Sequence, residues 1–235
     1  MTKFLLTPYL RLFFRIRVEG RGHIPDRGPA ILASNHISFC DSFFLPLVVP
    51  RRVRYIAKAE YFDNWKVAWF FRANGHIPLR RGEGADWKRA LDGAAEALAD
   101  GELFGIYPEG TRSKDGRLHR GHTGVARLAL HCRTPVLAVA MGGTAELQPI
   151  GQVRPRVFMP VTLRFSAPMT FERYYDRADD PRVLRQITDE IMFELRQLSG
   201  QEYVDTYAAR KAVVGAAAET RVRSTPPPEP IAAAG

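Results

Sequence analysis

The chain has 235 residues, of which 46% are hydrophobic, so it has the apolar content of a globular protein and is not a largely disordered one. Its formal net charge is +9, and only six of its 34 basic residues are lysine. A basic chain is attracted to polyanions such as nucleic acids, anionic lipid surfaces and phosphorylated ligands, and the charge alone does not choose among them.

The first predicted element is a basic amphipathic segment at residues 1–18. Within it, residues 4–18 form an apolar and aromatic run that arginines interrupt. Arg11 and Arg15 are four positions apart, so a helix places them on one face, with Phe13 largely on the other. This composition is typical of a helix that lies on a membrane surface, and a helix packed on its own domain is the alternative. The run is too short and too charged to cross a bilayer.

Two turns rich in Gly and Pro, at residues 20–28, separate this segment from the next elements. The apolar residues 30–33 predict a buried strand that leads into a polar loop. Residues 42–49 predict a short helix, and residues 51–56 predict a strand. Residues 61–73 are aromatic on nearly all sides, more than one core face requires. Such a segment is either deeply buried or in contact with lipid.

The second half of the chain continues the alternation. Helices are predicted at residues 85–99, 121–132 and 181–198, and strands at residues 103–107, 135–141 and 157–165, the last near a sheet edge. Strands that alternate with helices are typical of an α/β fold. We therefore expect a single domain at residues 19–211, with a mixed, mostly parallel sheet flanked by helices. Residues 212–235, rich in Ala and Pro, are predicted to form a disordered tail.

A polar segment with the sequence NHISFCD follows the first predicted buried strand, at residues 35–41. If this segment turns into a helix start, Asp41 reaches the imidazole of His36, fixes its tautomer and leaves the other ring nitrogen as a proton acceptor. Such a base contributes roughly 10²–10⁴ in rate when it takes a proton from a hydroxyl. Alone, the spacing is a weak signal, because loop histidines are usually structural and Asp41 is also suited to cap a helix.

A second polar segment, YPEGTRS at residues 107–113, follows another predicted buried strand. The guanidinium of Arg112 matches phosphate oxygens in bidentate fashion, although surface charge is the usual role of an arginine in this chain. Backbone N–H groups around Gly110 are suited to a phosphate or a developing oxyanion. Loops that follow strands carry the chemistry of α/β folds, so the two segments together indicate transfer chemistry on a phosphorylated hydroxyl compound.

The two cysteines, Cys40 and Cys132, give neither a disulfide framework nor a metal-ligand pattern. Cys40 lies near His36 and is a conceivable nucleophile, but the phenylalanines around it favour a packing role. No His, Cys, Asp and Glu residues have the spacing of metal ligands, so we expect no metal site.

Together the two motifs resemble those of the glycerolipid acyltransferase family, which includes the 1-acylglycerol-3-phosphate acyltransferases. The family's first block is Asn-His-x4-Asp, and residues 35–41 match it. The resemblance implies that His36 is the general base and that Asp41 supports it.

Further blocks of the family follow in order, so that the resemblance covers roughly residues 18–170. GHIPLRR at residues 75–81 is similar to the second block, with Arg81 at its arginine position, and YPEGTRS is similar to the third. The fourth block is weaker, because only Pro135 of its two prolines is present. Arg120 stands where a lysine is common, which keeps the charge but changes the donor geometry.

The resemblance implies that the protein moves a fatty acyl group from an acyl thioester to the free hydroxyl of lysophosphatidate, giving phosphatidate in phospholipid synthesis. Arg81 and Arg112 would then bind the phosphate, and Glu109 would orient an arginine or bind a glycerol hydroxyl. Gly110 and Thr111 belong to the same substrate-binding turn. No bound cofactor is expected, and acyl-CoA or acyl carrier protein supplies the thioester as co-substrate.

The expected partners are the lysophospholipid, the acyl thioester and a membrane surface with anionic lipids, which the protein contacts peripherally from the cytoplasmic side. One alternative is the same chemistry on another lysolipid or a glycolipid. A non-catalytic lipid-binding protein is an alternative from another class, but lipid binding alone does not need a base. Nucleic-acid binding rests only on charge, and no recognisable motif supports it.

Overall fold

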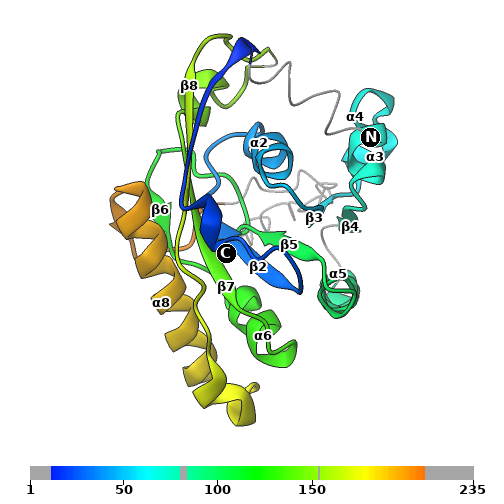
Figure 1. Ribbon diagram of the computed structural model, residues 1–235, viewed down its shortest axis with the longest axis vertical. Coiled ribbons are helices and arrows are strands. Elements are labelled where there is room, and N and C mark those ends of the chain that lie inside the picture. Colours follow the sequence, from blue (N-terminus) through cyan, green and yellow to red (C-terminus); the bar gives the residue numbers. More distant parts are fainter. Residues whose placement is uncertain (1–11, 80–83, 153, 210–235) are drawn as a thin grey trace, which may run out of the picture.

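The structure is a computed structural model that describes residues 12–79, 84–152 and 154–209. Its main feature is a 7-stranded sheet with the strand order β1-β8-β7-β2-β5-β3-β4 (Figure 1). The strands are β1 (Arg15–Glu19), β2 (Ala30–Ser34), β3 (Val53–Lys58), β4 (Ile77–Leu79), β5 (Leu103–Ile106), β7 (Val136–Gly142) and β8 (Pro160–Phe165). All neighbours in this sheet are parallel except β7 and β8. The predicted mixed, mostly parallel sheet is therefore confirmed.

Helices cover the sheet and connect its strands. They are α2 (Asp41–Val48), α3 (Glu60–Asp63), α4 (Trp65–Ala73), α5 (Gly84–Ala99), α6 (Gly124–His131), α7 (Thr144–Leu147) and α8 (Pro181–Ser199), with the 3-10 turns η1 (Arg21–His23) and η2 (Glu172–Arg177). A small second sheet pairs β6 (Leu118–His119) with β9 (Tyr203–Val204). Within the described residues, no helix combines the length and the apolar character needed to cross a bilayer.

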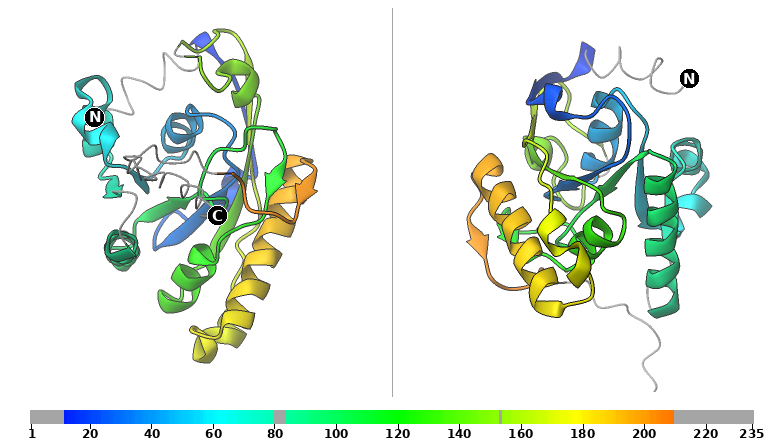
Figure 2. Two further views of the ribbon diagram at one scale, coloured as in Figure 1. Left: turned by 180° about the vertical axis from the view of Figure 1, so that it is seen from behind. Right: turned by 60° about the horizontal axis from the view of Figure 1, so that its bottom comes forward.

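The two faces of the sheet carry separate parts of the core. Ile31 packs with α5, α6 and α8 on one face, whereas its neighbour Leu32 packs with α2 on the other. Leu137 and Ala138 of β7 divide between the faces in the same way, because successive side chains of a strand point to opposite sides. Strands buried on both faces read as continuous apolar runs, which is why the sequence predicts β2 and β7 well. Figure 2 shows the yellow α8 running along its face of the sheet.

The predicted helix at the N-terminal side is wrong for residues 15–18, because Arg15–Glu19 form the edge strand β1. The sequence there alternates with period two: Ile16 and Val18 pack on the core, while Arg17 is exposed. The expected boundary at residue 18 falls inside this strand. Residues 1–11 and the expected tail at residues 212–235 lie outside the described residues.

The aromatic segment at residues 61–73 forms parts of α3 and α4, and its side chains divide between core and surface. Phe70 and Phe71 are fully buried, whereas Trp65 is 80% exposed and Trp69 is 51% exposed. The two exposed residues are four positions apart and so share one side of α4. The segment therefore contributes to the core and also presents an aromatic surface.

Candidate active site

The two sequence motifs lie side by side at the carboxyl ends of two central strands of the sheet. His36 lies in the loop between β2 and α2, and the turn at residues 107–113 follows β5. The two strands are parallel neighbours, with Ala33 opposite Ile106, so their carboxyl ends meet. Direct contacts join the loops as well: the backbone N–H of Ser113 donates to the carbonyl of His36 at 2.7 Å.

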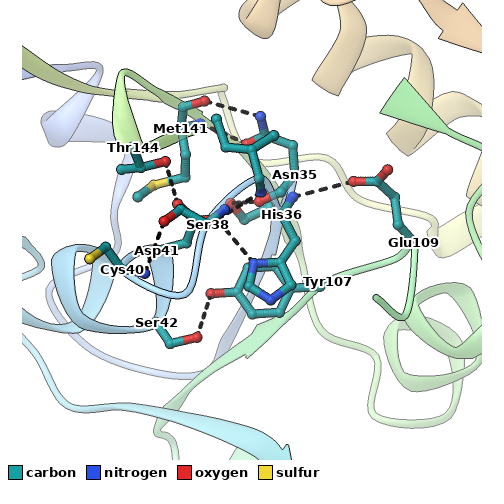
Figure 3. A network of polar contacts seen from close by, with 12 residues as sticks. Asn35, His36, Ser38, Cys40, Asp41, Ser42, Tyr107, Glu109, Met141 and Thr144 are labelled. Carbon is teal, nitrogen blue, oxygen red and sulfur yellow. Dashed lines mark hydrogen bonds and ion pairs between the residues drawn. The ribbon is translucent and has the colours of Figure 1, made fainter. Parts of the chain in front are cut away.

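Asp41 is the fixed point of the first motif (Figure 3). Its Oδ2 lies 3.0 Å from Nδ1 of His36 and also accepts the backbone N–H groups of Ile37 and Ser38, each at 2.8 Å. Its Oδ1 accepts the hydroxyl of Thr144 at 2.5 Å. The carboxylate is completely buried, so these donors replace the water that it loses. Residues 37–41 do turn into the start of a helix, as the spacing suggested.

The imidazole of His36 is held in one orientation from two sides. The Asp41 carboxylate accepts from Nδ1, so Nδ1 carries the proton of the neutral ring and Nε2 is the free acceptor. The ring of Tyr107 stacks on the imidazole, with 3.8 Å between centroids and 12° between planes. Among the described residues Nε2 has no hydrogen-bond partner, and the side chain is 16% exposed. This nitrogen is therefore placed to take a proton from a ligand.

Tyr107 is itself anchored, which makes it a rigid support for the imidazole. Its hydroxyl lies 3.1 Å from Oγ of Ser42 in α2, and its ring stacks on Tyr55 from β3. Burial raises the pKa of the Tyr107 phenol well above its usual range, so the ring stays neutral. The sequence showed a tyrosine at this position, but only the structure shows that it covers one face of the histidine.

Asn35 connects the histidine loop to the neighbouring strand β7. Its Oδ1 accepts the backbone N–H of Met141 at 2.7 Å, and its Nδ2 donates to the carbonyl of the same residue at 3.0 Å. The residue is fully buried, so these bonds are made without competition from water. Asn35 thus fixes the start of the loop that carries His36 (Figure 3).

Glu109, which the resemblance predicts to orient an arginine or bind a glycerol hydroxyl, makes two backbone contacts in the structure. It is 1% exposed, and its two carboxylate oxygens accept the backbone N–H groups of His36 at 3.2 Å and of His119 at 3.0 Å. Burial raises its pKa to about 7, although the two backbone donors act in the opposite direction. Glu109 therefore connects the His36 loop to the segment that carries His119. The polar motif in the sequence did not reveal that this carboxylate is buried.

The next three residues are less buried: Gly110 is exposed, and Thr111 and Arg112 are partly buried. Gly110 has φ +69°, a conformation that favours glycine, and its N–H donates to the carbonyl of Tyr107 at 2.9 Å. Among the described residues, neither the backbone N–H groups of Thr111 and Arg112 nor the Arg112 guanidinium make a hydrogen bond or ion pair. These donors are available to an anion. Arg81, the other arginine expected at the site, lies outside the described residues.

The structure favours the packing role of Cys40. Burial raises the pKa of its thiol to about 12, and the S–H donates to Oε1 of Gln148 at 3.0 Å. A thiol in this state is a poor nucleophile. In the part of the chain that the structure describes, no three His, Cys, Asp or Glu side chains gather in a way that could hold a metal ion.

Comparison with known proteins gives consistent matches. The sequence model of the Acyltransferase family matches residues 15–142. The chloroplastic 1-acyl-sn-glycerol-3-phosphate acyltransferase LPAT1 of Arabidopsis thaliana is 32% identical over 140 residues, which are 59% of this chain and 39% of the relative. A 1-acyl-sn-glycerol-3-phosphate acyltransferase of Limnanthes douglasii is 30% identical over 167 residues, which are 70% of this chain and 58% of the relative.

A solved structure is also similar. The crystal structure of PlsC from Thermotoga maritima, a 1-acyl-sn-glycerophosphate acyltransferase, superimposes with a TM-score of 0.63 at 29% identity. The match covers 83% of this chain and 76% of that chain. Against the curated relatives, the matched region spans only about two fifths to three fifths of their length.

Proposed function

This chain belongs to the acyltransferase family, and from that premise we propose that it transfers a fatty acyl group from an acyl thioester to the free hydroxyl of lysophosphatidate, giving phosphatidate. One observation carries the proposal: Asp41 holds His36 so that, among the described residues, Nε2 has no hydrogen-bond partner, and Thr111 and Arg112 lie in the neighbouring turn, which contacts the His36 loop directly. The named activity of the relatives supports the choice of lysophosphatidate as acceptor.

The proposed reaction uses His36 as a base and then as an acid. Nε2 takes the proton of the acceptor hydroxyl as its oxygen bonds to the thioester carbonyl carbon. The carbonyl oxygen becomes an oxyanion, and its return to a carbonyl breaks the C–S bond. The thiolate leaves and receives the proton from Nε2, so the imidazole is regenerated. Asp41 stabilises the imidazolium between these steps and keeps the ring in its tautomer.

Substrate grip is the second part of the proposal. Arg112 and the N–H groups of Thr111 and Arg112 bind the phosphate, since a guanidinium and a concave set of N–H groups both match phosphate oxygens. Holding the acceptor hydroxyl next to Nε2 can lower the activation barrier by up to about 7–11 kcal/mol. This reduction is larger than the one that proton transfer to the base provides. Arg81 is proposed as a further phosphate ligand on the family motif alone.

The donor and the location belong to the same proposal. The co-substrate is an acyl thioester of CoA or of acyl carrier protein, and the protein acts peripherally at the cytoplasmic side of a membrane. The net charge of +9 and the exposed Trp65 and Trp69 support contact with an anionic lipid surface.

The test is an assay of purified protein with lysophosphatidate and a panel of acyl-CoA and acyl carrier protein thioesters, with products identified by mass. His36→Ala is expected to lower kcat by at least about 10²-fold. The matched control is His131→Ala, because His131 also pairs with an aspartate, Asp179, but on the exposed surface of α6. Near-normal turnover by purified His36→Ala protein would contradict the proposed mechanism.

The phosphate grip is tested with Arg112→Ala. We expect this variant to raise KM for lysophosphatidate by about tenfold or more, with a smaller change for the thioester, because only the acceptor carries the phosphate monoester at this position. Arg173→Ala is the control, since its guanidinium pairs with Glu190 on the surface of α8. A KM for lysophosphatidate equal to that of the wild-type protein would exclude Arg112 from the phosphate site.

A further inference from the structure

A segment that follows α8 returns to the active site. We call residues 200–207 the C-terminal strap. β9, within the strap, pairs in parallel with β6, which follows the phosphate-binding turn in sequence. Figure 2 shows the orange β9 beside the green β6. The strap is thus paired with the segment at residues 118–119, a few residues after Arg112.

Contacts at both ends of this pairing fasten the strap. The N–H of Leu118 donates to the carbonyl of Glu202 at 2.8 Å, and the N–H of Arg120 donates to the carbonyl of Thr206 at 3.1 Å. The ring of Tyr207 stacks on His122, with 4.5 Å between centroids. The strap therefore holds the backbone of residues 118–122 together with the turn after β5, where Glu109 accepts the N–H of His119 and the carbonyl of Pro108 accepts the N–H of His122.

Gln201 is the residue of the strap that reaches both active-site loops. Its Oε1 accepts Nδ2 of Asn35 at 2.8 Å, and its Nε2 donates to the carbonyl of Gly116 at 2.7 Å. Asn35 precedes the catalytic histidine, and Gly116 lies four residues after Arg112. One side chain thus spans the loop of the base and the segment of the phosphate grip.

The network determines which way each amide points. The N–H of Met141 can only donate, so the atom of Asn35 that faces it is the oxygen, and the Asn35 nitrogen faces Gln201. Gln201 must then present its own oxygen to Asn35 and its nitrogen to the carbonyl of Gly116, which can only accept. The glutamine side chain supplies both the acceptor oxygen and the donor nitrogen that these two contacts require.

We propose that Gln201 is a positioning residue that sets the spacing between the base His36 and the phosphate-binding turn. It touches no reacting atom and acts through Asn35 and Gly116. The inference rests on the proposed function, because the spacing matters only if one substrate must reach both places. Small displacements between a base and a binding group are costly, since they change the geometry of attack.

The first experiment measures the strap without any reaction. Hydrogen exchange is compared in the wild-type protein, Gln201→Met and Gln186→Met. Gln186 is the control, because it donates one hydrogen bond to the Tyr174 hydroxyl on the exposed side of α8. We expect backbone amides of residues 113–120 to exchange faster in Gln201→Met only. Unchanged exchange in Gln201→Met would overturn the proposal.

The second experiment is a double-mutant cycle on acyl transfer to lysophosphatidate. Gln201→Met is expected to lower kcat/KM on the order of tenfold in the wild-type background, and at most about twofold in the Arg112→Ala background, because the spacing no longer matters once the grip is lost. Gln201→Glu is expected to be at least as impaired as Gln201→Met, since its second oxygen faces the Gly116 carbonyl.

The outcomes separate the two proposals. Equal losses in both backgrounds would mean that Gln201 only stabilises the fold, and this would overturn its positioning role. Should the wild-type protein fail to acylate lysophosphatidate or any other lysolipid, the proposed function fails. The exchange experiment then still decides whether Gln201 holds the 113–120 segment in place.

Discussion

At the scale of single residues, the arrangement around Asp41 explains why the histidine is oriented so firmly. The carboxylate accepts hydrogen bonds from His36, Ile37, Ser38 and Thr144, so it is fixed before it supports the imidazole. A carboxylate with many donors does not need to reorganise when the imidazolium forms. The helix-start geometry and the support of the base are therefore two roles of one side chain.

Glu109 gives a prediction about pH. Its pKa in the folded protein is about 7 against an ordinary value of 4.5, so between these values the folded state holds a proton that the unfolded state has lost. The free energy of unfolding of the wild-type protein, relative to that of Glu109→Gln, should therefore fall as the pH rises from about 4.5 to about 7 and be level above it. Urea denaturation across this range measures the difference. A difference that is flat with pH, or that rises, would contradict the burial argument.

At the scale of elements, the edge strand β1 depends on the turn that follows it. Gly20 has φ +71°, and a Cβ there would lie 2.2 Å from the carbonyl oxygen of Phe165 in β8. Gly28 has a similar φ of +77° but open space around it. The two glycines therefore separate the cost of backbone strain from the cost of a clash with the sheet.

We expect Gly28→Ala to lower the free energy of unfolding by about 1–2 kcal/mol, the usual cost of this conformation for a residue with a Cβ. Gly20→Ala should cost about 1–3 kcal/mol more, because backbone must move to relieve the contact. Chemical denaturation of both variants gives the comparison. Equal decreases in the free energy of unfolding would show that the backbone at Phe165 moves away from the added Cβ without a measurable loss of stability.

The elements differ in how far the sequence predicts them. The continuous apolar run of β2 and the helical spacing in α8 are strong local signals, and both predictions are confirmed. β1 was missed because its period-two pattern lasts only five residues and follows an aromatic run that favours a helix. The contact between His36 and Asp41 was predicted from their spacing in the sequence, and the structure confirms it. The bonds from Thr144 and Gln201 join residues more than 100 positions apart, and no local pattern encodes them.

At the scale of the whole molecule, the net charge of +9 predicts that the protein binds anionic membranes more strongly than neutral ones. Sedimentation with vesicles should show more binding to phosphatidylglycerol than to phosphatidylcholine, and binding should fall as salt rises from about 0.05 to about 0.5 M, because salt screens surface charge. The binding that remains at high salt should decrease in Trp65→Ala and Trp69→Ala, since these exposed rings suit a membrane interface. Equal binding to both vesicles would contradict the electrostatic part.

The pairing of β1 with β8 also affects how the chain folds during translation. Arg15 lies opposite Pro160, so 145 residues separate the two partners. At about 5–20 residues per second, β1 waits roughly 7–30 seconds for the synthesis of β8. During translation its backbone has no sheet partner, and nascent-chain binding factors have that interval in which to engage residues 15–19.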